Sequence, residues 1–183
     1  VSERPAQFSW TLPTPAEEDA TFFFERSDLL PLSLQEKYPD ILVYEGIDPE
    51  EPSRQIRLEC RSDGVHWMAV DAQDRYTAVY SRENGLRIER EQAKPRKPFA
   101  CGAEQILPTS AALRSANLAL EGQEWTLRLA ITTTYEFTQY HGGTKAQTMA
   151  ALATIVNRLN LVYERDLGVH FVLAAGMDTL IID

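Results

Sequence analysis

Apolar and polar residues alternate along the first half of the chain in short runs that turn signals separate. The run Gln55–Arg61 places three apolar residues on one face of a strand and three charged residues on the other. Ser62-Asp63-Gly64 is a turn signal, and Val65–Asp71 continues the alternation. Period-two alternation with tight turns predicts an antiparallel meander over about residues 41–89, with one face in the core and one face in water.

Upstream of this meander the pattern is less regular. Three prolines interrupt residues 1–20, which predicts an irregular arm there. Thr21–Glu25 is rich in aromatic residues and predicts a strand. A short helix is predicted over Asp28–Lys37, with Ser27 as its cap and Tyr38-Pro39 at its end.

In the second half the period changes from that of a strand to that of a helix and back. Trp125–Thr133 alternates as a strand. Thr144 and Gln147 have the spacing of a capping box, which predicts a helix from there to about Arg165. Val169–Ala175 follows as a second strand. A strand, a helix and a strand form a right-handed crossover, so the two strands should be parallel.

One helix cannot cover both faces of a parallel strand pair, so this unit should present an apolar face that needs another cover. We expect the first half, a second copy or further chain to cover four residues: Leu129, Ile131, Phe171 and Leu173.

The stretch between the two halves lacks any period, which predicts a linker. The domain organisation that follows is a β-rich unit over residues 1–95, a linker over 96–124 and a second unit over 125–183. The predicted fold class is α+β, with an antiparallel β-meander followed by a partial βαβ unit.

Composition and charge exclude several classes of protein. The chain has 183 residues, 44% of them apolar and 25% charged, which is ordinary for a globular protein. The net charge of −9 argues against nucleic acid and anionic membranes as partners, because both attract clusters of Lys and Arg. No apolar run approaches the length of a membrane span, and Val1 opens a polar stretch without the features of a signal peptide.

A family resemblance rests on several motifs in order along the chain. Val156–Tyr163 reads Val-Asn-Arg-Leu-Asn-Leu-Val-Tyr, and His141–Thr144 reads His-Gly-Gly-Thr. With Ile131–Thr134 and Tyr163–Leu167, these motifs resemble the opening of the catalytic domain in bacterial secreted reprolysin-like zinc metalloproteases of the metzincin group. Leu34–Gly46 and Gly64-Val65-His66 resemble the pro-regions of those proteases.

The resemblance implies a zymogen: a pro-region that shields and helps to fold the catalytic domain, in a secreted or periplasmic protein. It implies zinc and protein substrates for the parent protein, and the remainder of the catalytic domain as the partner of this chain. The family binds zinc through His-Glu-x-x-His-x-x-Gly-x-x-His. Here Trp67, Gly142 and Phe171 follow the three histidines, so we expect no catalytic residue and no bound zinc in this chain. Arg128 stands where animal and venom relatives often carry a calcium-binding Glu, so we expect no calcium site there.

Cys101 has two interpretations. It precedes Gly102, just after the stretch that resembles a pro-region, and resembles a cysteine switch, whose thiolate would hold the catalytic zinc of the zymogen and displace the water nucleophile. The alternatives are a disulfide with Cys60 or an inert thiol, and the sequence leaves them open. Activation would then require a cut within Thr109–Gln123, where Arg114 is the only basic residue.

Other polar residues favour structural roles. His66 and His170 alternate with apolar residues on strands and should face solvent or a neighbouring chain, and His141 should serve a turn. Glu164 and Asp166 flank Arg165 at the end of the helix, as in a solvated ion cluster. Two residues three apart on that helix should bond to nearby loop backbone: Asn157 and Asn160.

The alternative to a zymogen fragment is a stand-alone secreted binding or inhibitory module without catalytic activity.

Overall fold

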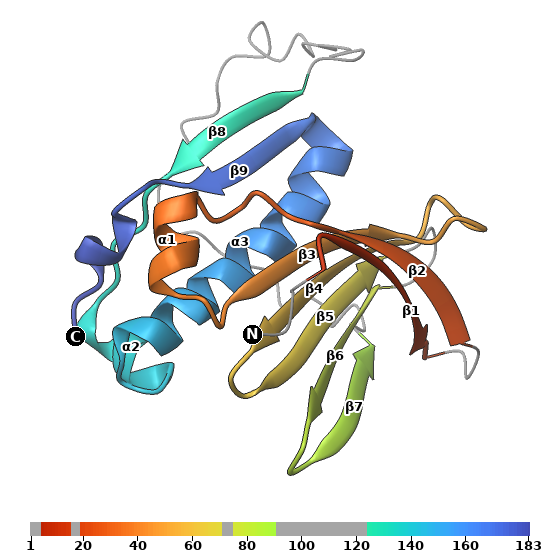
Figure 1. Cartoon of the computed structure of the whole chain (residues 1–183), viewed down its shortest axis with the longest axis horizontal. Helices are drawn as coiled ribbons and strands as arrows, with labels where there is room; N and C mark the ends of the chain where they lie inside the picture. The colour runs from red at the N-terminus through yellow and green to blue at the C-terminus, as the bar shows by residue number, and fades with distance from the viewer. Residues whose placement is uncertain (1–4, 16–18, 71–74, 91–123) are drawn as a thin grey trace, which may run out of the picture.

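The computed structural model describes residues 5–15, 19–70, 75–90 and 124–183. The predicted linker, the activation segment and Cys101 lie outside these residues. A seven-stranded antiparallel sheet occupies the first half, and its strands lie side by side in chain order (Figure 1). They are β1 (Gln7–Pro13), β2 (Asp19–Arg26), β3 (Leu42–Ile47), β4 (Gln55–Arg61), β5 (Gly64–Val70), β6 (Arg75–Ser81) and β7 (Gly85–Arg90).

The second half is a parallel strand pair joined by a long helix. Its elements are β8 (Trp125–Leu129), α2 (Tyr135–Tyr140), α3 (Lys145–Leu167), β9 (Val169–Leu173) and a short 3-10 turn, Met177–Leu180. The two strands pair in parallel from Trp125 opposite Val169 to Leu129 opposite Leu173. The α+β class, the antiparallel meander and the partial βαβ unit are therefore confirmed.

The long helix begins at the predicted cap and ends at Leu167, two residues after the predicted end near Arg165. Thr144 caps α3, because its hydroxyl accepts a hydrogen bond from the backbone N–H of Gln147 at 3.3 Å. Gly168 ends the helix in the left-handed conformation at φ 64°. No helix in the part of the chain that the structure describes is long and apolar enough to cross a membrane.

Two expectations for the N-terminal region are wrong. Residues 7–13 form β1 rather than an irregular arm, because Phe8 and Leu12 alternate inward despite the nearby prolines. The Phe8 ring stacks on Phe24 with centroids 5.0 Å apart, and Leu12 is buried. The helix α1 spans only Leu32–Lys37, with Pro31 at its N-cap position.

The inner face of the curled sheet holds an aromatic core. Its largest fully buried side chains come from four different strands and are Phe22, Phe24, Tyr44, Trp67 and Tyr76. The turn between β4 and β5 needs glycine at position 64. Gly64 has φ 145°, and a Cβ there would lie 2.2 Å from the Tyr80 carbonyl oxygen.

The outer face of the meander is not wholly in water, which corrects the expectation of one wet face. Helix α3 lies between the meander and the two-stranded sheet, against β4 and β9 (Figure 1). It buries two charged side chains of β4, Arg57 and Glu59. Met68 and Val70 of β5 form a small apolar cluster with Leu161 of α3. The solvated part of the sheet includes β7, most of whose residues are exposed.

A second apolar core joins the two halves. From the first half it takes Leu29, Leu30, Leu34, Tyr38, Ile41 and Val43, and from the second half Met149, Leu152, Val156, Leu173 and others. Leu129, Ile131 and Phe171 pack against it, as expected for a face that the first half covers. The backbone joins in as well, since the Leu173 N–H donates to the Leu29 carbonyl at 2.8 Å.

Candidate functional site

We call the polar contacts between residues 5–90 and residues 124–183 the inter-half interface. It contains buried charged side chains from both parts of the chain. Helix α3 brings Asn157 and Arg158 to the outer face of β4. The Asn157 amide donates to Glu59 Oε1 at 2.7 Å, and the Arg158 guanidinium lies 3.8 Å from Glu59 Oε2. Asn157 therefore bonds to a carboxylate of the first half, and not to loop backbone as expected.

Glu59 is the most deeply buried carboxyl of this interface, with 1% of its surface exposed. Burial raises its pKa from 4.5 to about 7, although Arg158 and the Asn157 amide act in the opposite direction. Among the described residues, neither Glu59 Oε2 nor Asn157 Oδ1 has a hydrogen-bond partner. Two facing side chains thus each present an unsatisfied acceptor.

Asn160 ties the helix to β9. Its amide nitrogen donates to the Phe171 carbonyl at 2.9 Å, and its amide oxygen accepts from the Phe171 N–H at 2.8 Å. The side chain thus replaces a neighbouring strand for one residue of β9. The expectation of a bond to backbone is correct for Asn160, although that backbone belongs to a strand.

His170 lies between two carboxylates, one from each half of the chain. Its Nδ1 is 2.5 Å from Glu164 Oε1, and its Nε2 is 2.7 Å from Asp28 Oδ1. The bond to Glu164 raises the pKa of the imidazole, burial opposes that rise, and Asp28 adds to it. The imidazolium form can donate to both carboxylates at once. The expectation that His170 faces solvent or a neighbouring chain is wrong.

Arg57 of β4 extends this network into the first half. Its buried guanidinium pairs with Glu164 and lies 3.4 Å from Glu45. Glu164 is therefore an interface residue and not part of a solvated cluster. The solvated cluster exists without it, since Arg165 pairs with its exposed neighbour Asp166 at 2.8 Å.

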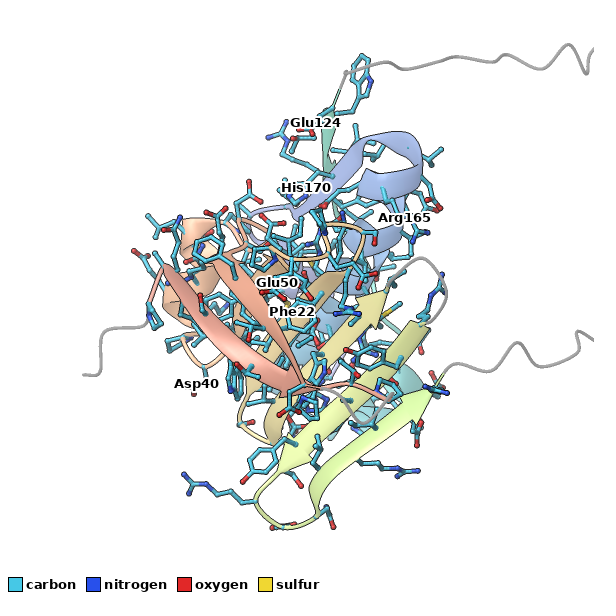
Figure 2. All side chains as sticks on the ribbon, turned by 90° about the vertical axis from the view of Figure 1, so that its right-hand side faces the viewer. Phe22, Asp40, Glu50, Glu124, Arg165 and His170 are labelled. Atoms are coloured by element: carbon cyan, nitrogen blue, oxygen red, sulfur yellow. The ribbon has the colours of Figure 1, made fainter. Side chains whose placement is uncertain are left out.

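A pocket of about 430 Å³ opens beside this network. Eight residues of both halves line it: Arg26, Asp28, Glu45, Glu124, Thr126, Glu164, Gly168 and His170. In Figure 2, His170 lies toward the end of the molecule that carries Glu124 and Arg165, away from Phe22 in the curled sheet. Carboxylates outnumber cations in this lining, so the pocket is acidic.

A third contact lies at the C-terminal end of the chain. Asp178, which is buried, accepts a hydrogen bond from the Tyr38 hydroxyl at 2.9 Å and pairs with Lys37. Burial and the bond to Asp178 raise the pKa of Tyr38 to about 12. The same contacts hold the pKa of Asp178 below its usual value, with Lys37 as the main cause. Asp178 therefore fastens the segment after β9 to the end of α1.

The other residues that the sequence singled out stay apart. His66 lies 3.3 Å from Asp63, and burial lowers its pKa. His141 ends α2, and its ring contacts Phe137 with centroids 4.4 Å apart. Cys60 carries a free, half-buried thiol whose pKa burial raises.

Zinc has no suitable ligand set in the regions that the structure describes. No three His, Cys, Asp or Glu residues there are placed to hold a metal ion. Both ring nitrogens of His170 already contact carboxylates. The contacts of this interface join two parts of the chain, residues 5–90 and residues 124–183.

The sequence did not indicate this interface as a site. The only signal for Arg57 and Glu59 is that they share one face of β4, and for Asn157 and Asn160 that they lie three apart on a helix. Neither pattern says that the strand and the helix meet, because these pairs lie about a hundred residues apart in the chain.

Comparison with known proteins gives one match. Residues 124–182 match the family described as Metallo-peptidase family M12B Reprolysin-like. The matched region contains β8, α2, α3 and β9. No curated protein and no solved structure matches the chain. Residues 124–182 are therefore similar to a reprolysin-like metallopeptidase domain.

Proposed function

We propose that this chain is part of a zinc metalloendopeptidase zymogen, in which residues 1–95 are the pro-region and residues 125–183 begin the catalytic domain. The observation that carries the proposal is the family match over residues 124–182. The way in which the first half packs on the matched part adds to it, because a pro-region must bind the domain that it precedes.

The first half would shield the catalytic part and help it to fold. The unit of β8, α3 and β9 has too little structure of its own to bury both faces of its strand pair. Residues 29–43 supply apolar side chains to the core that contains Met149, Leu152 and Leu173. A segment that contributes so much of a neighbour's core would act as a template for that neighbour's folding.

The zinc ligands and the general base would belong to the parent protein outside this sequence, since no histidine here is followed by Glu. The parent would cleave protein substrates after secretion to the periplasm or the medium. Cys101 would hold the zinc of the zymogen until the chain is cut within residues 109–123. Both features lie outside the described residues, so these assignments rest on the sequence resemblance.

The test compares two purified proteins. Residues 1–183 should cleave no casein, whereas a parent chain with the zinc motif should do so after activation and lose this activity to a chelator. In the parent, Cys101→Ser should allow cleavage before activation, with Cys60→Ser as the matched control that leaves the zymogen silent. A parent reading frame without any zinc motif, or chelator-sensitive proteolysis by residues 1–183, would overturn the proposal.

A further inference from the structure

Two proton-binding groups lie at separate points of the inter-half interface. Glu59 of β4 faces Asn157 and Arg158 of α3, and His170 of β9 faces Asp28 of the first half. Each group therefore joins residues 5–90 to residues 124–183. Each also lies where a change of protonation alters a contact between the halves rather than within one of them.

We propose that the inter-half interface is a pH-dependent latch. By this we mean that the interface is more stable when Glu59 and His170 are protonated, and less stable when they lose their protons. This latch goes beyond the proposed function, because it concerns how the two parts of this chain hold each other and requires no protease activity.

The geometry at Glu59 favours the protonated carboxyl. Glu59 Oε2 and Asn157 Oδ1 are both acceptors, and neither has a hydrogen-bond partner among the described residues. A proton on the carboxyl turns Glu59 Oε2 into a neutral donor, while Glu59 Oε1 keeps its bond from the Asn157 amide. An ionised Glu59 instead leaves a buried charge whose nearest cation, Arg158, is 3.8 Å away.

The other charged groups near Glu59 do not reverse this preference. Arg57 and Arg61 of the same strand and Arg158 of α3 lower its pKa, but burial outweighs them. His66 of β5 lies opposite Glu59 in the sheet, and burial lowers its pKa, which disfavours a positive charge beside Glu59.

The geometry at His170 favours the imidazolium. Glu164 and Asp28 are acceptors on opposite ring nitrogens, so a neutral ring can donate to only one of them. Loss of the proton therefore sets a ring lone pair against a carboxylate. Arg57 faces Glu164 from β4, Asn160 faces the ring from α3, and Arg26, Glu45 and Glu124 share the adjoining pocket.

Both groups act in the same direction as the pH rises. The pKa of Glu59 is raised from 4.5 to about 7, so its stabilising share is complete below 4.5 and is lost as the pH rises to about 7. The pKa of His170 is raised above 6.5, so its share is complete below 6.5 and is lost as the pH rises through the raised value. The halves should therefore hold each other more tightly at pH 5 than at neutral or alkaline pH.

The first measurement is urea unfolding of the whole 183-residue chain between pH 5 and pH 8. We expect the unfolding constant of the wild type to increase relative to that of Glu59→Gln on the order of 100-fold over this range, since each pH unit between the two pKa values contributes up to tenfold. His170→Gln should reduce further the change of the unfolding constant between pH 5 and pH 8. The matched controls are Glu89→Gln on exposed β7 and His141→Gln, and both should show the same change as the wild type.

The second measurement isolates the interface. A recognition site for a specific protease, placed within residues 103–113, lets the folded chain be cut once between its halves. On dilution at pH 5 the halves should stay together in gel filtration, and at pH 8 they should separate at a higher concentration. The double variant Glu59→Gln, His170→Gln should remove most of that difference.

Equal association of the wild-type halves at both pH values, or an unchanged difference in the double variant, overturns the latch. Neither readout involves proteolysis by this chain, so the proposed function can fail or hold independently.

Discussion

Asn160 shows how much one buried side chain can carry in this molecule. Its amide makes both hydrogen bonds to the Phe171 backbone, and the residue is 1% exposed. Asn160→Ala would remove the partners of the partly buried Phe171 N–H and carbonyl and should cost about 2–4 kcal/mol of unfolding free energy. Asn84→Ala in the exposed turn before β7 is the control and should cost little. Urea unfolding measures both, and equal losses would contradict the role assigned to Asn160.

The residue scale is also where the sequence failed most clearly. The bond of Asn160 to backbone was predictable, since a lone amide on a buried helix face needs a partner. Glu164 and His170 were not, because their partners Arg57 and Asp28 lie more than a hundred residues away in the chain. The alternation of a histidine with apolar residues does not indicate that its ring lies between two carboxylates. Cys101 lies outside the described residues and stays a prediction.

At the scale of elements, the turn between β4 and β5 is a point where the backbone fixes the residue. Gly64 has φ 145°, and a Cβ there would meet the Tyr80 carbonyl oxygen of the neighbouring strand β6. Gly64→Ala should therefore distort the sheet and cost about 3 kcal/mol or more. Gly85→Ala is the matched control. Its φ is 67°, but open space surrounds it, so it should cost only about 1–2 kcal/mol. Similar unfolding midpoints for the two variants would show that the close approach to β6 is unimportant.

Local patterns predicted most elements but not their environment. Alternation and turn residues indicated β3 to β7, and the capping pair indicated the start of α3. The prolines concealed β1, whose inward residues are only Phe8 and Leu12. The charged face of β4 looked like a wet face because alternation shows which residues share a side of a strand, and not what covers that side.

At the scale of the whole molecule, the two halves depend on each other unequally. The meander has an apolar core of its own, built from Phe22, Phe24, Trp67 and others. The second half relies on the shared core, to which the first half contributes six buried side chains: Leu29, Leu30, Leu34, Tyr38, Ile41 and Val43. At about 1.5–3 kcal/mol for each buried apolar side chain, their loss amounts to about 9–18 kcal/mol, which is comparable to the stability of a whole domain.

Because of this difference, we predict that one half folds alone and the other does not. Residues 1–90 should fold alone, with near-ultraviolet circular dichroism from the buried Trp67 and dispersed amide resonances in NMR spectra. Residues 124–183 should remain unfolded or aggregate, since Met149, Leu152 and Leu173 would lose their cover.

Addition of residues 1–90 should restore dispersed resonances to residues 124–183, and more completely at pH 5 than at pH 8. A variant of residues 1–90 with Leu30→Asp should still fold but should fail to rescue, because Leu30 belongs to the shared core and not to the core of the meander. Independent folding of residues 124–183 would contradict the template role of the first half.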